Sequence, residues 1–195
     1  YKNSTMLKEL CGYNKIHLTE NMRSDDRMFN LYHKTLKGED VGDEFTQDKV
    51  SRLNICYYNK TRHRLNKEIS EQVSKRKKKV MTIDDKPVYK DLPLVCKKTD
   101  KKMDIVNNER FVVTSYQKNI VNVKNDRVQL SIQFKDLFEY FDMAYAITGH
   151  CSQGQTFECQ YTIHDWDRIP EQQRNSWRYV AISRTSNKDN IYICG

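Results

Sequence analysis

The feature that most constrains the fold of this chain is an apolar run that ends abruptly in a polar loop. Met143 to Ile147 has the length and side chains of a buried strand, and Gly154 stands where a sharp strand-to-helix connection needs a glycine. The loop carries groups that suit hydrogen bonding to phosphates and sugars, at Thr148, His150, Ser152, Gln153, Gln155 and Thr156. Because open α/β sheets bind ligands at the carboxyl ends of their strands, we expect a binding site in this loop.

The charge of the chain fits a polyanionic partner. Over 195 residues the formal net charge is +8 at pH 7, which favours nucleic acid, although lysine-rich composition can also serve solubility alone. A chain of this length can bury one main core with a small satellite. We therefore expect one principal domain.

The cysteines and the hydropathy of the chain narrow its class. Six cysteines are scattered without any Cys-x-x-Cys pair, which indicates reduced thiols in an intracellular protein. The spacing of Cys151, Cys159 and His164 fits no familiar zinc framework, so we expect no metal site. No run approaches a membrane span, and the N-terminus lacks the apolar core of a signal peptide. The sequence predicts a soluble protein that is not bound to a membrane.

Strand and helix patterns alternate in the first part of the chain and again in the last part. The elements expected in the first part are a helix at Met6–Leu10 closed by Gly12, a strand at Ile16–Leu18, a helix from a cap at Ser24 or Asp25 to Gly38, a strand at Leu53–Tyr58 and a helix at Asn59–Val73. Residues 38–51 have the composition of a loop. The last part adds a strand at Gln160–His164, a helix at Pro170–Trp177, a strand running from Tyr179 into a loop at Thr185, and a strand at Ile191–Cys194.

The middle of the chain has a different pattern. After the basic run Lys75–Lys79, short strands alternate with turn signals, and the expected strands are Leu92–Cys96, Arg110–Ser115, Ile120–Val123 and Val128–Ile132. Asn107-Asn108 and Asn125-Asp126 are good turn sites, since Asn and Asp tolerate a left-handed backbone. Closely spaced strands between two α/β segments predict a small β-barrel insertion.

Four segments, in the right order, resemble motifs of superfamily 1 helicases. Thr148, His150, Gln153 and Gly154 fall on the Thr-x-His-x-x-Gln-Gly pattern of motif V, in the form that the RecD-like subgroup carries. The segment Tyr179–Thr185 is very close to motif VI and places Arg184 at its arginine.

The two earlier segments lie near the start of the chain. The Leu-x-x-Asn-x-Arg segment that ends at Arg23 resembles motif IV. Asn59 opens a segment similar to the one that precedes the inserted small domain in the family.

The chain also departs from the family pattern at two places. The Asn-Gly-(Glu/Asp) turn that introduces the family's insertion is represented by Asn107-Asn108-Glu109, without the glycine. Thr156 stands where many relatives carry a glutamate that contacts the ATP ribose, so that role is not carried over.

The resemblance implies a fold and a division of the chain. The fold class is α/β, with a RecA-like parallel-sheet domain and a small SH3-like β-barrel insertion. Residues 1–79 and 143–195 would form the RecA-like domain, which is the second one of such helicases, and residues 80–142 would form the insertion.

The resemblance also implies a function. The chain would be the C-terminal half of an ATP-dependent helicase that moves 5′-to-3′ on single-stranded DNA. Arg23 and Arg184 would act on the γ-phosphate of ATP as arginine fingers, and Gly154 would also face the nucleotide. The residues implied to contact the DNA strand are Asn59, Thr148, His150, Ser152 and Gln153.

One expected part of such an enzyme is missing from the sequence. No Gly-x-x-x-x-Gly-Lys-(Ser/Thr) loop occurs in the 195 residues, and that loop is the usual cradle for nucleotide phosphates. ATP and Mg²⁺ would therefore be held mainly by a first RecA-like domain of the same parent protein, which these residues lack. We expect the chain to be inactive as an ATPase by itself.

Simpler interpretations stand beside these. Arg23 and Arg184 could be surface charges, Asn59 could simply cap the helix that it opens, and His150 could only fix the turn around it. The chain could also be a nucleic-acid-binding module without motor activity, or a structural or regulatory protein derived from a helicase. RNA could replace DNA as the bound strand, because contacts to the backbone need not depend on the sugar.

Overall fold

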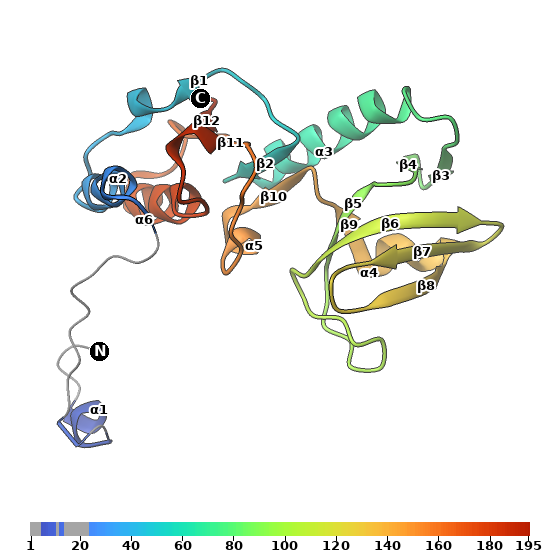
Figure 1. Ribbon diagram of the computed structural model, residues 1–195, viewed down its shortest axis with the longest axis horizontal. Coiled ribbons are helices and arrows are strands. Elements are labelled where there is room, and N and C mark those ends of the chain that lie inside the picture. The colour runs from blue at the N-terminus through green and yellow to red at the C-terminus, as the bar shows by residue number, and fades with distance from the viewer. Residues whose placement is uncertain (1–4, 11, 14–23) are drawn as a thin grey trace.

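Two five-stranded sheets organise this protein, and Figure 1 shows them side by side. The computed structural model describes residues 5–10, 12, 13 and 24–195. The first sheet is parallel throughout, and its strands lie in the order β1 (Thr46–Gln47), β12 (Ile191–Ile193), β11 (Tyr161–Ile163), β2 (Leu53–Cys56) and β10 (Ala146–Thr148). The predicted parallel α/β sheet is therefore confirmed.

Helices cover both faces of the parallel sheet because its strands are apolar on both faces. Ile55 and Ile147 belong to one core, which α2 (Asp26–Leu36) and α6 (Glu171–Ile182) cover. The neighbouring residues Cys56 and Ala146 point to the opposite face and pack against α3 (Asn59–Ser74). Figure 1 shows α2 and α6 together, with α3 extending toward the second sheet.

Local signals fix the ends of the first helices. The carboxylate of Asp25 accepts the backbone N–H of Met28 at 2.7 Å, so Asp25 is the N-cap of α2. Gly38, with a φ of +87°, follows the end of this helix as predicted. The predicted helix near the N-terminus is α1 (Thr5–Leu10). The predicted strand at Ile16–Leu18 lies outside the described residues.

The second sheet is antiparallel and has its own apolar core. Its strands lie in the order β8 (Gln129–Gln133), β7 (Ile120–Lys124), β6 (Arg110–Gln117), β5 (Pro93–Cys96) and β9 (Phe141–Met143). A separate hairpin, β3 (Met81–Ile83) and β4 (Lys86–Val88), precedes it, and α4 (Leu137–Tyr140) leads into β9. Three 3₁₀ turns complete the described elements, at η1 (Gly42–Glu44), η2 (Phe134–Asp136) and η3 (Lys188–Asn190).

The single strand predicted at Met143–Ile147 is wrong, because the run is shared between the two sheets. The chain leaves β9 at Met143 and enters β10 at Ala146. Between them, Ala144 donates its N–H to the carbonyl of Pro93 at 2.9 Å, and the carbonyl of Tyr145 accepts from the N–H of Asn54 at 2.8 Å. The whole run is buried, and its residues are divided among three cores. Met143 and Tyr145 pack with the antiparallel sheet. Ala144 and Ile147 pack under α2 and α6, and Ala146 packs against α3.

The strand predicted from Tyr179 is also wrong, since Tyr179 to Ile182 is the end of α6. The buried residues of this helix are Trp177, Arg178, Ala181 and Ile182, which follow helical spacing. A short apolar run fits a strand or a buried helix equally well by periodicity alone. The other predicted elements within the described residues are present with ends shifted by a few residues, while β1, the hairpin β3–β4 and α4 are additional.

No helix among the described residues is long and apolar enough to cross a lipid bilayer.

Candidate functional site

The segment that follows β10 is a one-turn helix, where the sequence predicts a loop. Thr148 caps this helix, α5 (Gly149–Ser152), because its hydroxyl oxygen accepts the N–H of Cys151 at 3.3 Å. Ser152 is fully buried, and its hydroxyl donates to the carbonyl of Gly149 at 2.7 Å. Both residues were predicted to contact a nucleic-acid strand. Thr148 is half-buried, whereas the side chain of Ser152 points into the protein interior.

Two glycines fit this segment for different reasons. Gly149 lies directly against the indole of Trp177, where a Cβ would be 2.5 Å from the Nε1 atom. Gly154 has a φ of +80°, a left-handed conformation that favours glycine, and no neighbour within 4 Å of an added Cβ. The strand-to-helix connection predicted at Gly154 is wrong, because the chain leads from there to β11.

His150 and Gln153 are the exposed side chains of this segment. Both residues point into solvent from the turn of α5 and its end. The backbone N–H of Gln153 donates to the carbonyl of His150 at 3.2 Å, which closes the turn without using either side chain. The imidazole and the amide therefore remain accessible to a ligand.

Arg184 lies buried between this segment and the end of α6. Its Nε atom donates to the carbonyl of Val180 at 2.8 Å, and its Nη2 atom donates to the hydroxyl of Ser183 at 2.8 Å. Its Nη1 atom reaches the carbonyls of Ser152 at 3.1 Å and Gln155 at 3.4 Å. Arg184 is only 6% exposed, so the interpretation as an ordinary surface charge is wrong. The guanidinium joins the segments predicted as motifs V and VI.

Asp165 occupies the N-terminus of α3. Its carboxylate accepts the backbone N–H groups of Tyr57 at 3.2 Å and Tyr58 at 3.1 Å, and the hydroxyl of Thr61 at 2.7 Å. Asn59 is the first residue of this helix, so the interpretation of Asn59 as its cap is wrong. The side chain of Asn59 is exposed and accepts instead from the Nε of Arg62 at 3.1 Å.

Two buried asparagines hold the strands that carry the site. Asn66 of α3 pairs with the backbone of Ala146, accepting its N–H at 2.9 Å and donating to its carbonyl at 2.8 Å. This pairing satisfies β10, which is an edge strand of the parallel sheet.

Asn54 of β2 makes a second buried contact. It donates to the carbonyls of Ser51 and Tyr145, so its oxygen accepts from Nε2 of His164 at 2.8 Å. Burial lowers the pKa of His164 to about 4.

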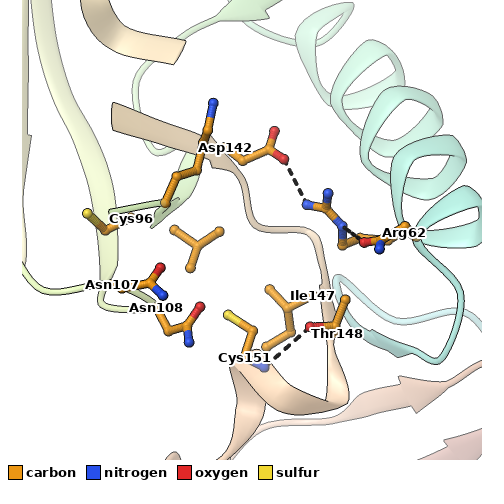
Figure 2. Close-up of a pocket in the computed structure, with 11 residues that line it drawn as sticks. Arg62, Cys96, Asn107, Asn108, Asp142, Ile147, Thr148 and Cys151 are labelled. Carbon is orange, nitrogen blue, oxygen red and sulfur yellow. Dashed lines mark hydrogen bonds and ion pairs between the residues drawn. The ribbon is translucent and has the colours of Figure 1, made fainter. Parts of the chain in front are cut away.

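A cavity of about 290 Å³ separates the two sheets (Figure 2). It brings together two predicted contact residues that are far apart in sequence, Asn59 and Thr148. The antiparallel sheet contributes the turn at Asn107 and Asn108. Asn108 has a φ of 69°, a left-handed conformation that asparagine adopts more readily than most residues.

The charge around this cavity is basic. Nη1 of Arg62 contacts the carboxylate of Asp142 at 2.7 Å, which links α3 to β9 across the upper rim in Figure 2. Lys97 also lines the cavity. Amides, hydroxyls and cations of this kind suit the backbone of a nucleic acid. Sequence reasoning missed Arg62, Lys97 and Asp142, which only the tertiary structure brings together.

No group of three His, Cys, Asp or Glu side chains lies together within the described ranges in the way that would hold a metal ion. Gly154 and Arg184 have the positions given above, and Arg23 lies outside the described residues.

The comparisons with known proteins find a likeness in fold alone. No protein-family model and no curated protein matches the sequence. A structure of two coordinating Pif1 helicases at forked dsDNA has a TM-score of 0.66 at 15% identity, covering 98% of this chain and 56% of that chain. The Bacteroides Pif1 helicase in complex with ADP-AlF3 and ssDNA has a TM-score of 0.65 at 16% identity, covering 91% and 51%.

A further structure, of Bacteroides Pif1 bound to ssDNA, has a TM-score of 0.63 at 16% identity and covers 91% of this chain and 51% of that chain. The chain thus spans about half the length of the helicases that it matches. At this level of identity the likeness establishes the fold, which is the predicted α/β fold with a RecA-like parallel sheet.

Proposed function

We propose that this chain is the second RecA-like half of an ATP-dependent DNA helicase of the RecD-like subgroup. Residues 1–79 and 143–195 are its RecA-like domain, and residues 80–142 are an SH3-like insertion. The fold likeness to about half of Pif1 supports this proposal. The observation that carries it is the contact of Arg184 with the carbonyls of Ser152 and Gln155, because it connects the segments that resemble motifs V and VI.

In this proposal, single-stranded DNA lies along the carboxyl edge of the parallel sheet. Thr148, His150 and Gln153 contact its backbone from one side of the cavity, and Asn59 contacts it from the other. Ser152 contributes through its backbone, since its side chain is buried. Such contacts to phosphate and sugar carry no base preference, which suits a protein that moves along a strand.

ATP and Mg²⁺ are held mainly by a first RecA-like domain of a longer parent protein. This chain supplies Arg23, Gly154 and Arg184 to the nucleotide cleft. The contacts of Arg184 with protein oxygens mean that a phosphate in the cleft competes with the carbonyls of Ser152 and Gln155. Movement of this one side chain would therefore disturb the segment that contacts DNA.

The alternative is a nucleic-acid-binding module without motor activity. The buried position of Arg184 favours this alternative, because the guanidinium has a structural role in joining two segments and needs no nucleotide to explain it. RNA is the other strand that the same contacts could hold, since they need not involve the sugar.

Binding of single strands tests the first part of the proposal. His150→Ala should weaken the affinity of this chain for a labelled single-stranded DNA about 2- to 10-fold, as expected for one lost hydrogen bond of about 0.5–1.5 kcal/mol. The melting temperature should change little, because the imidazole is exposed. His33→Ala, which removes an exposed histidine from α2, is the matched control and should bind normally.

Two results would count against a DNA contact at His150. Unchanged affinity at every salt concentration, together with a lower melting temperature, would assign His150 a structural role. An equal loss in His33→Ala would mean that general charge accounts for binding.

ATP turnover tests the motor assignment. In a longer protein that joins this chain to a phosphate-binding RecA-like domain, Arg23→Ala and Arg184→Ala should each lower turnover sharply, since arginine fingers supply about 10³–10⁵ in rate in related reactions. Single-strand affinity should stay within a few-fold. Normal turnover with either variant would remove that arginine from the nucleotide cleft, and turnover by this chain alone would contradict the two-domain arrangement.

A further inference from the structure

Arg110 faces the candidate site from the antiparallel sheet. It begins β6 and pairs directly with Val95 of β5, so the two side chains share one face of the sheet. Val95 packs into the same core as Cys151 and Phe157, which belong to the segment after β10. The guanidinium carbon of Arg110 lies 5.8 Å from the centre of the Phe157 ring. Arg110 therefore points from one sheet toward the segment of the other that carries Thr148 and His150.

A further contact shows that these parts adjoin. The amide of Gln155 donates to the carbonyl of Cys151 at 2.8 Å and reaches the carbonyl of Asn108 at 3.5 Å. The turn that precedes Arg110 thus lies against the segment after α5. Arg110 does not itself line the cavity, whereas Asn108 in the preceding turn and its strand partner Val95 do.

The charge of Arg110 lacks a counter-charge within the described part of the chain. No carboxylate and no hydrogen-bond acceptor there pairs with it, and its ionisable neighbours are the thiols of Cys151 and Cys159. Desolvation by burial lowers the pKa of Arg110. Arg127 of the same sheet differs, since it is exposed and paired with Asp104 and Glu109.

A half-buried guanidinium loses part of its hydration, and no ion pair within the described residues compensates Arg110 for that loss. Its planar fork matches the oxygens of a phosphate, and a phosphate supplies the missing negative charge. The cation–π contact with Phe157 favours this position of the guanidinium.

We propose that Arg110 binds a backbone phosphate of single-stranded DNA, opposite Thr148 and His150. The antiparallel sheet then forms the second wall of the binding site, and the strand passes between the two sheets. This assignment rests on the proposed function for the identity of the ligand. The charge and position of Arg110 support a phosphate site independently of it.

The test uses this chain and a fluorescein-labelled oligo(dT) of about 15 nucleotides, a length that covers the usual site size. Arg110→Gln should weaken binding about tenfold, the low end for a hydrogen bond to a charged group. It should also reduce the slope of log affinity against log salt by about 0.7, the value for one phosphate contact on a single strand. The melting temperature should stay the same or rise, because a half-buried charge without an ion-pair partner is removed.

Two further variants make the result specific. Arg110→Lys keeps the charge without the planar fork, so its salt slope should be normal and its affinity intermediate. Arg127→Gln removes an arginine that is already paired, so it should bind like the unaltered chain. Equal affinity of Arg110→Gln and the unaltered chain at every salt, or equal losses in Arg110→Gln and Arg127→Gln, would overturn the assignment.

Failure of the proposed function gives a different result. If the unaltered chain binds no oligonucleotide at low salt, that function is wrong, and inorganic phosphate then decides the role of Arg110. A melting temperature that rises with phosphate in the unaltered chain and Arg127→Gln, but not in Arg110→Gln, keeps Arg110 as a phosphate site. Equal shifts in all three proteins overturn it.

Discussion

The two sheets are stabilised in different ways. Around the parallel sheet, buried polar side chains hold backbone groups through matched hydrogen bonds, as Asn66 and Asp165 do. In the antiparallel sheet the interior is apolar, with Val113 and Val121 fully buried, and charged residues such as Arg127 pair at the surface. Removing a buried polar side chain leaves its partner without a hydrogen bond, which costs the desolvation free energy of that partner. Shortening an apolar side chain costs free energy only in proportion to the apolar area that is no longer buried. Substitutions of the buried polar residues around the parallel sheet should therefore have the larger effects on stability.

The largest effect should come from Asn66→Ala. The substitution leaves the N–H and the carbonyl of Ala146 buried without partners, and each such group costs about 1–3 kcal/mol. We expect a loss of about 2–5 kcal/mol in the free energy of unfolding, measured by urea titration.

Asn122→Ala is the matched control in the antiparallel sheet. The side chain of Asn122 bonds to Ser115 and Ser131 near the surface, where water can replace them. Its loss should stay within about 0.5 kcal/mol. Equal losses for the two asparagines would remove the contrast between the sheets.

The glycines of the site should give intermediate effects. Gly149→Ala places a methyl group against Trp177 and should cost about 1–3 kcal/mol, the usual range for overpacking. Gly154→Ala meets no neighbour but must adopt a left-handed conformation, which costs about 1–2 kcal/mol. In the antiparallel sheet, Asn108→Gly should be neutral, because its φ of 69° already suits glycine.

Thermal unfolding of these three variants sharpens the comparison. We expect the melting temperature to fall most for Gly149→Ala and least for Asn108→Gly. A Gly149→Ala protein with an unchanged melting temperature would mean that Trp177 moves aside freely.

A smaller, pH-dependent effect should come from His164. Its pKa is about 4 in the folded protein, against an ordinary value of 6.5. Between these values the unfolded chain binds a proton that the folded chain does not, so stability falls as pH decreases from about 6.5 to about 4. The slope should be at most about 1.4 kcal/mol per pH unit.

Urea titrations across this pH range, on the unaltered chain and on His164→Gln, measure the difference. Glutamine can still donate to Asn54 but does not titrate, so the variant should show a shallower slope. Parallel slopes would mean that His164 becomes protonated in the folded state without cost.

The smallest effect should come from a surface pair of the antiparallel region. Lys98 contacts the carboxylate of Glu139 at 2.6 Å, and both side chains are exposed. Glu139→Gln should leave the melting temperature nearly unchanged at low salt and fully unchanged at high salt, because salt screens exposed pairs. A clear loss that persists at high salt would show that surface charge stabilises this sheet more than the comparison allows.

Local patterns predicted the elements whose signals lie within the element. The cap at Asp25, the apolar spacing of α3 and the turn at Asn108 are local signals, and the structure confirms each of them. The hairpin β3–β4 was missed because its turn uses Asp84 and Asp85, both left-handed without any glycine. β1 was missed because it has only two residues in a polar segment.

The rest depends on contacts between distant residues. Nothing near Asp165 in the sequence indicates that it caps a helix that begins more than 100 positions earlier. The same holds for Trp177 against Gly149, and for Asn66 beside β10. The segment after β10 could be located from the sequence, whereas Arg62, Lys97 and Asp142, which line the cavity beside it, could not.

The short connection between β9 and β10 has a mechanical consequence. Only Ala144 and Tyr145 separate the two strands, and each is buried and hydrogen-bonded to a neighbouring strand or its flank. The ion pair of Arg62 and Asp142 also links α3 to β9, next to this connection. Because this connection is so short, we expect a displacement of the antiparallel sheet to displace β10 as well. We therefore expect the same displacement to move Thr148, at the end of β10.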